Sequence, residues 1–280
     1  MRKQLTLVAT GLATLFALTA CGGGTSTTPS AEATLDPANP TVVKVGAVPV
    51  PHAKILEFID DNLAKDAGID IEITEFDDYQ TPNVALSEGS IDANYYQHLP
   101  WLEDQIKTKG YNFEHGAGVH IEPYAAFSDK YKDPAEVPDG ATVAITNDPS
   151  NQIRALRVLE SVGLLQNIQD DSAVLTLTDE QNPKGLKFEE NQPEILVTLV
   201  ADPKVDIALV NGNFILQAGL STKDALAVES VENNPYANFL AWRAGEETPA
   251  IAKLDELLHT DQVRDYITKT WPNGDVTPAF

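Results

Sequence analysis

Strand-like and helix-like segments alternate along the chain from Thr41 onward. The run 42–48 is rich in β-branched residues, which predicts a buried strand. Apolar residues then recur at helical spacing over 55–63, and Gly68 ends that predicted helix. Over 69–74, isoleucines alternate with polar residues, as in a half-buried strand.

The same alternation continues to the C-terminal part of the chain. Further predicted elements are a strand over 141–145, a helix from Pro149 to Val162, a strand over 204–210, a helix ending near Gly219 and a helical pair over 249–270. Strands that alternate with helices in this way predict an α/β fold with mainly parallel sheets.

The N-terminal residues read as a secretion signal. Arg2 and Lys3 precede an apolar stretch that ends at Ala20, which is shorter than the roughly 20 residues of a spanning helix. The small residues before Cys21 resemble a bacterial lipobox, so we expect residues 1–20 to be a signal peptide and Cys21 to be lipidated. The alternative is a plain secretory signal beside a chance cysteine.

Residues 21–40 are rich in Gly, Ser, Thr, Ala and Pro. Such a composition cannot bury a core, which predicts a lipidated flexible tether. The expected location is therefore the cell membrane, with the body anchored through Cys21 and facing the extracytoplasmic side. No later apolar run is long enough to span a membrane.

Composition narrows the function. The chain has 42 acidic and 19 basic residues, a formal net charge of −23, which argues against a nucleic-acid partner. The single cysteine excludes an intramolecular disulfide and a multi-cysteine metal site. P-loop, dinucleotide-binding, serine-hydrolase and zinc-protease motifs are missing, so we expect a binding protein without catalytic residues or a cofactor rather than an enzyme.

Two segments, 76–83 and 91–101, are dense in aromatic and amide side chains at the ends of predicted strands. Ligands of open α/β sheets bind outside the carboxyl ends of strands. We therefore predict an aromatic-walled pocket that contains Tyr79, Tyr96 and His98. Ordinary core packing of these aromatic residues is the alternative.

A third segment, 147–157, has a strong helix-start signal after a strand. Arg154 lies in the first turns of this helix, where exposed N–H groups favour an anion, and a guanidinium matches a carboxylate bidentately. Arg154 is therefore the candidate for a substrate carboxylate, with Asn151 beside it. The alternative is a surface ion pair with one of the many acidic residues.

Asparagines cluster at 211–213 and at 233–238. Because an amide both donates and accepts hydrogen bonds, Asn211 and Asn238 could serve a zwitterionic ligand. These residues could equally be turn or cap residues. Five histidines could suggest a metal site, but His115 and His120 are five apart and share neither a helix face nor a strand face, so no metal site is expected.

In combination, these motifs resemble those of the NlpA/MetQ family of lipoproteins, the methionine-binding components of ABC importers. The match runs from about Val43 to about Trp271. Its motifs are Asp78-Tyr79 with Pro82-Asn83, Asp92-Ala93-Asn94 with Gln97-His98, His120-Ile121-Glu122-Pro123, Asn147-Asp148-Pro149-Ser150-Asn151 with Arg154-Ala155-Leu156, Ala218-Gly219-Leu220, and Pro235-Tyr236-Ala237-Asn238.

The resemblance implies a two-lobed, type II-like periplasmic-binding-protein fold with the ligand in the cleft. Residues 41–124 and 236–280 would form lobe 1, and residues 125–235 lobe 2. Arg154 would bind the carboxylate of L-methionine, and Asn211 and Asn238 would hold its backbone. The side chain would lie against the three residues predicted to wall the pocket. The implied partners are an ABC permease with its ATPase, and the protein is expected to be a monomer.

Three departures from the family pattern bear on the ligand: Val50 before Pro-His, Ile153 beside Arg154, and Phe214 where tyrosine is frequent. Alternatives to L-methionine are another amino acid or a short methionine-containing peptide. Two further readings are an extracellular α/β enzyme using His98 and nearby aspartates, and a metal-binding lipoprotein.

The lipobox generates a direct prediction. Cys21→Ala removes the only thiol that can be lipidated, so the protein should leave the membrane fraction while its ligand binding stays intact. Cell fractionation followed by immunoblotting measures this. A variant that stays in the membrane fraction would show that the anchor lies elsewhere.

Overall fold

The computed structural model describes residues 34–280. The predicted signal peptide, Cys21 and the tether up to residue 33 lie outside these described residues. The predicted tether continues to residue 40, but Leu35 is partly buried against the hydrophobic core, and Thr41 N donates to Gly68 O at 2.9 Å. The folded body therefore begins before Thr41. Over the described residues, every helix is too short or too polar to cross a membrane.

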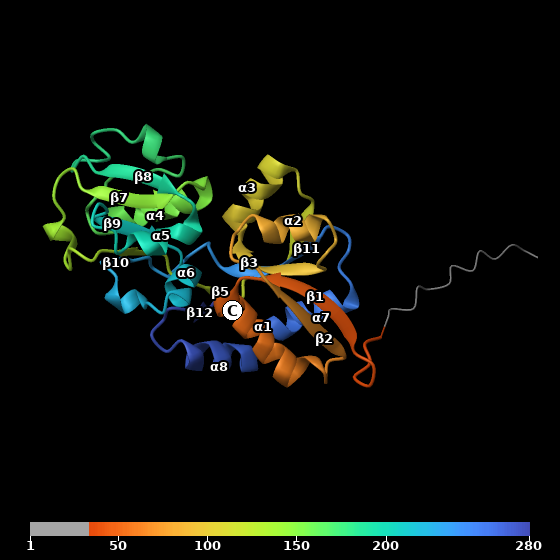
Figure 1. Ribbon diagram of the computed structural model, residues 1–280. Coiled ribbons are helices and arrows are strands. Elements are labelled where there is room, and N and C mark those ends of the chain that lie inside the picture. Colours follow the sequence, from red (N-terminus) through yellow and green to blue (C-terminus); the bar gives the residue numbers. More distant parts are fainter. Residues whose placement is uncertain (1–33) are drawn as a thin grey trace, which may run out of the picture. The chain divides into compact units, whose positions relative to one another are not determined.

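The first lobe is built on a seven-stranded mixed sheet (Figure 1). At its centre, β1 (Thr41–Ala47) pairs in parallel with β2 (Ile69–Glu75) and β3 (Ala93–His98). On its other side β3 pairs antiparallel with β11 (Asn238–Arg243), which brings a late segment of the chain beside the early strands. The short strands beyond β11 are β4 (Phe113–His115), β5 (His120–Ile121) and β12 (Thr277–Pro278).

Helices cover both faces of this sheet. One face carries α1 (Lys54–Ile59), α7 (Pro249–Leu258) and α8 (Asp261–Thr270), with the short helical segments η1 (Pro49–Ala53) and η2 (Asp60–Ala64) flanking α1. The other face carries α2 (Thr81–Ser87) and α3 (Leu99–Lys109). Successive residues of β1 point to opposite faces of the sheet. Val43 and Val45 pack against α1, α7 and α8, whereas Gly46 lies on the face of α2 and α3, close to Ile91.

The second lobe is built on a five-stranded sheet in the order β10-β6-β9-β7-β8. Here β7 (Thr142–Thr146) pairs in parallel with β8 (Lys187–Asn191) and β9 (Ile207–Val210), and β6 (Ala125–Phe127) and β10 (Ala227–Val228) add an antiparallel edge. Its helical elements are α4 (Pro149–Ser161), α5 (Pro193–Leu199), α6 (Gly212–Gln217), η3 (Pro134–Glu136), η4 (Val174–Thr176) and η5 (Thr222–Asp224).

Two segments carry the chain between the sheets. The outgoing segment lies between β5 and β6 (residues 122–124), and the returning segment lies between β10 and β11 (residues 229–237). The two are hydrogen-bonded to each other, because Glu229 N donates to Tyr124 O at 2.8 Å and Tyr124 N donates to Glu229 Oε2 at 3.1 Å. We call residues 122–124 and 229–237 the crossing segments.

The two-lobed α/β fold predicted from the sequence is confirmed, but the expectation of mainly parallel sheets is wrong. The returning segment delivers β11 antiparallel to β3, and β6 enters the second sheet antiparallel to β9. Strand–helix alternation cannot reveal these pairings, because they join segments far apart in sequence.

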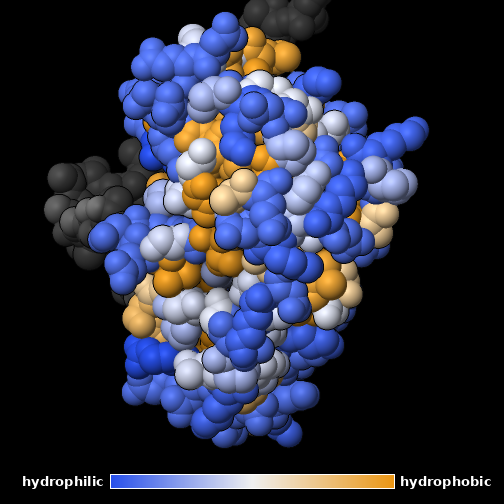
Figure 2. All heavy atoms as spheres, turned by 90° about the vertical axis from the view of Figure 1, so that its left-hand side faces the viewer, coloured by the Kyte–Doolittle hydropathy of each residue, from blue (hydrophilic) through white to orange (hydrophobic). Residues whose placement is uncertain are grey.

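Figure 2 shows that the outer face of the second lobe is largely hydrophilic, in keeping with the acidic composition.

Packing at the start of the body can be tested with two glycines. Gly68 (φ +76°) and Gly89 (φ +75°) share the left-handed conformation, but an added Cβ at Gly68 would lie 2.8 Å from Asp36 N, whereas nothing lies within 4 Å at Gly89. We expect Gly89→Ala to lower the free energy of unfolding by about 1 kcal/mol, and Gly68→Ala to lower it by clearly more. Urea denaturation measures both. Equal losses would show that residues 35–36 do not pack on Gly68.

Candidate functional site

A cavity lies between the lobes. Its lining comes from both lobes and from the outgoing crossing segment: His52, Tyr79, Tyr96, Gln97, His98, Trp101, Glu122, Asn151, Arg154, Asn211, Gly212, Asn213 and Asn238. Cavities that bind small molecules commonly combine an apolar wall with a few convergent polar groups.

The structure brings all seven predicted site residues to this cavity. Tyr79 lies in the loop after β2, Tyr96 and His98 lie on β3, and Asn151 and Arg154 lie on α4. Asn211 directly precedes α6, and Asn238 is the first residue of β11. The position of each residue is thus established, while the individual roles stay predictions.

Aromatic rings form one wall. The ring centroid of Tyr79 lies 5.9 Å from that of Trp101 and 5.3 Å from that of Phe214. Hydrogen bonds fix the wall: Trp101 Nε1 donates to Tyr96 OH at 3.1 Å, and Tyr96 OH donates to Tyr79 O at 2.9 Å. Burial raises the pKa of Tyr79 and of Tyr96, so both hydroxyls stay neutral. The wall is therefore apolar, rigid and uncharged.

His98 joins this wall to a set of amides on the second lobe. Its Nδ1 accepts from Trp101 N at 3.2 Å, so its Nε2 carries the proton and donates to Asn151 Oδ1 at 3.1 Å. Burial, aided by the charge of Arg154, lowers the pKa of His98 to about 3, and the ring is neutral. Asn211 Nδ2 donates to the same Asn151 oxygen at 3.2 Å. His98 and Asn151 thus link the two lobes across the cavity.

Three polar atoms beside the cavity are buried without a hydrogen-bond partner among residues 34–280. Those of the amide side chains are Asn211 Oδ1, an acceptor, and Asn213 Nδ2, a donor, and His52 Nδ1 is a third such atom of a lining residue. Buried polar groups in folded proteins are nearly always paired. An unpaired acceptor and an unpaired donor at one cavity suit a ligand that carries both kinds of group.

Arg154 is buried and already paired. Its Nε and Nη2 each donate to Glu229 at 2.6 Å, and Nη2 also donates to Glu122 O at 2.6 Å. Its guanidinium carbon lies 4.5 Å from the ring centroid of Tyr236. Burial disfavours the charge, but the ion pair with Glu229 outweighs burial and raises the pKa of Arg154. The sequence analysis weighed an anion site against a surface ion pair. The structure shows a buried ion pair at the cavity.

Only two of the three donor nitrogens of Arg154 are used within the described part of the chain. Nη1 forms no hydrogen bond to residues 34–280. Arg154 therefore keeps one donor for a further acceptor at the cavity.

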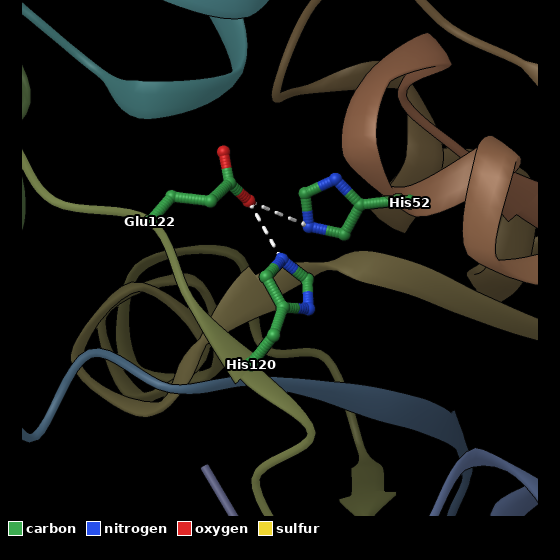
Figure 3. Close-up of side chains that lie close together, drawn as sticks. All are labelled: His52, His120 and Glu122. Atoms are coloured by element: carbon green, nitrogen blue, oxygen red, sulfur yellow. Dashed lines mark hydrogen bonds and ion pairs between the residues drawn. The ribbon is translucent and has the colours of Figure 1, made fainter. Parts of the chain in front are cut away.

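The sequence analysis missed a cluster of His52, His120 and Glu122 (Figure 3). Glu122 Oε1 lies 3.2 Å from His52 Nε2 and 2.9 Å from His120 Nε2, and all three side chains are buried. Burial lowers the pKa of His52 to about 4 and of His120 to about 3, and it raises the pKa of Glu122. A signal was present, since residues two apart in an extended segment, such as His120 and Glu122, point to the same side.

These three residues also form the one group among residues 34–280 whose ligand atoms lie close enough to hold a metal, within 4.8 Å of one another. Two neutral imidazoles and a carboxylate are ligand types that zinc accepts. The expectation of no metal site stays a prediction.

The three departures noted in the sequence lie at different distances from the cavity. Phe214 is buried and packs on Tyr79, so the missing hydroxyl leaves that wall apolar. Ile153 is partly buried against the second-lobe core and does not line the cavity. Val50 precedes Pro51 and the cavity residue His52 in η1, which contacts α6 of the other lobe.

Comparisons with known proteins agree with this architecture. The family model for NlpA lipoprotein matches residues 43–280. The methionine-binding lipoprotein MetQ of Bacillus subtilis is 38% identical over 242 residues, covering 85% of this chain and 88% of that protein.

Two solved structures share the fold. A lipoprotein from Actinomyces odontolyticus is 47% identical with a TM-score of 0.80, covering 86% of this chain and 99% of that one. A nutrient-binding protein from Burkholderia cenocepacia, solved bound to methionine, is 34% identical with a TM-score of 0.79, covering 85% of this chain and all (100%) of that one. With the family model matched over nearly the whole described body, the chain belongs to the NlpA lipoprotein family.

Proposed function

We propose that this protein is a lipid-anchored extracytoplasmic binding protein that captures L-methionine and delivers it to the permease and ATPase of an ABC importer. The observation that carries the proposal is the cavity between the lobes, with an aromatic wall on one side and Arg154 with unpaired amide groups on the other. The relative solved with methionine supports the choice of ligand.

Each end of methionine has a matching surface. The thioether would lie against Tyr79, Tyr96 and Trp101, since sulfur makes favourable contacts with aromatic rings. The carboxylate would accept from Arg154 Nη1 and Asn213 Nδ2. Asn211 and Asn238 would hold the backbone of the amino acid. Neutral His98 completes the side-chain pocket without adding charge.

The cleft offers a mechanism for capture and release. Tyr79 OH donates to Asn213 across the cleft, and His98 donates to Asn151, so ligand and cross-lobe contacts together favour a closed form. Hinge motion at the crossing segments would open the cavity, and the closed form would be what the permease recognises. The ligand is bound and released unaltered, and the protein acts as a monomer anchored through Cys21.

Substitution of Arg154 tests the carboxylate assignment. A charge-assisted hydrogen bond contributes about 1.5–3 kcal/mol, so Arg154→Ala should weaken L-methionine binding by at least about tenfold to a hundredfold. Arg154→Lys should rescue only part of the loss. The planar guanidinium can bond to Glu229 and to a ligand at the same time, and a lysine ammonium cannot reproduce that geometry. Calorimetric titration measures all variants.

Arg157→Ala is the matched control. Arg157 lies on the same helix but is exposed and pairs with exposed Asp170, so its removal should change the affinity little. Circular dichroism must show that Arg154→Ala stays folded, because Arg154 also joins the crossing segments. A folded Arg154→Ala with unchanged affinity would move the carboxylate site elsewhere.

A further inference from the structure

The cluster of Glu122 with two histidines has a defined hydrogen-bond polarity. Tyr95 is fully buried, and its hydroxyl contacts only His120 Nδ1 among residues 34–280. If His120 Nδ1 carried the proton, the hydroxyl proton of Tyr95 would have no acceptor, which buried groups avoid. Tyr95 therefore donates to Nδ1, and His120 Nε2–H donates to Glu122 Oε1.

The tautomer of His52 follows in the same way. Its Nε2 faces two acceptors, Asn238 Oδ1 and Glu122 Oε1, both at 3.2 Å, so Nε2 carries the proton. Nδ1 is then an unprotonated nitrogen, buried without a partner in the described chain. Two N–H groups thus point at one oxygen of Glu122, as Figure 3 shows.

The second oxygen of Glu122 has no such partner. Oε2 makes no hydrogen bond to residues 34–280, and Figure 3 shows it directed away from both imidazoles. Both histidines are neutral, and the charge of nearby Arg154 is taken up by Glu229. Burial therefore disfavours the ionised carboxylate at the cavity wall. Among residues 34–280 only the charge of nearby Arg154 favours it, and Arg154 makes its ion pair with Glu229 instead.

The position of Glu122 indicates which group of a ligand would bind its free oxygen. Its backbone oxygen accepts from Arg154 Nη2, so an acidic side chain and a cationic side chain adjoin at one cavity. An α-amino acid presents an ammonium and a carboxylate just as close together. We propose that Glu122 Oε2 binds the protonated α-amino group of the ligand and that His52 and His120 are positioning residues for that carboxylate.

This inference rests on the proposed function and sharpens its ligand class. The ligand must carry a free, protonated α-amine beside its carboxylate. Amino acids acylated on nitrogen are excluded, because an amide has no positive charge and its acyl group would have to occupy the space next to Glu122. A methionine-containing peptide could enter only with its free N-terminus at Glu122.

The test compares two ligands on two variants. Calorimetric titration of L-methionine and of its desamino analogue is carried out on the wild-type protein and on Glu122→Gln. Glu122→Gln should weaken L-methionine binding by at least about tenfold, the loss expected for a charge-assisted hydrogen bond, and should leave the analogue's affinity nearly unchanged. Glu72→Gln, at an exposed position on β2, is the control and should behave as wild type.

The outcomes separate the two proposals. If the wild-type protein does not bind L-methionine, the proposed function fails. If it binds L-methionine but Glu122→Gln loses equal affinity for both ligands, or for neither, the ammonium site is overturned. Zinc titration of the wild-type protein provides a further arm: stoichiometric binding that His120→Gln abolishes would show that the cluster is a metal site instead.

The positioning role has its own readout in the pH profile. The titratable and charged groups around Glu122 are His52 from η1, His120 from β5, Arg154 from α4, Tyr95 from β3 and Tyr79 from the loop after β2. An ammonium binds the ionised carboxylate, so affinity should fall as pH falls through the raised pKa of Glu122, and Glu122→Gln should lack this fall. His120→Leu removes the N–H donor to Glu122 and should move the fall to higher pH. An unmoved profile would reduce His120 to a packing residue.

Discussion

Arg154 joins the two crossing segments that connect the lobes. It binds the carboxylate of Glu229 on the returning segment and the backbone oxygen of Glu122 on the outgoing one. Burying a guanidinium is costly unless it is paired, and here the crossing segments pair its Nε and Nη2. A single side chain therefore fixes α4, both crossing segments and the cavity wall relative to one another.

The remaining electrostatics of the cavity follow from burial. Histidines and tyrosines that line it are held neutral, so the wall that faces an apolar side chain carries no charge. Charge is confined to the place where Arg154 and Glu122 meet. A zwitterion with an apolar tail fits such a division, whereas a ligand with net charge would leave one buried group without its counterpart.

Local signals in the sequence predicted the parts that depend on local physics. Isoleucine and valine runs marked β1 and β2, Pro149 marked the start of α4, and aromatic and amide clusters marked the cavity residues. The sequence did not reveal which residues those side chains contact in the fold. Arg154 and Glu229 are 75 positions apart, and His52 meets Glu122 only because η1 packs beside the crossing segments. The antiparallel strand β11 escaped prediction for the same reason.

The central claim is that this cavity holds intact L-methionine. Native mass spectrometry of the protein freshly purified from its source cells, followed by release and identification of any bound molecule, tests it most directly. The account predicts one molecule of unaltered methionine per chain. Dialysis under mildly denaturing conditions should remove this methionine, and titration of the refolded protein with methionine should restore it. A chain that carries a different small molecule, a metal ion, or a chemically altered methionine would contradict it.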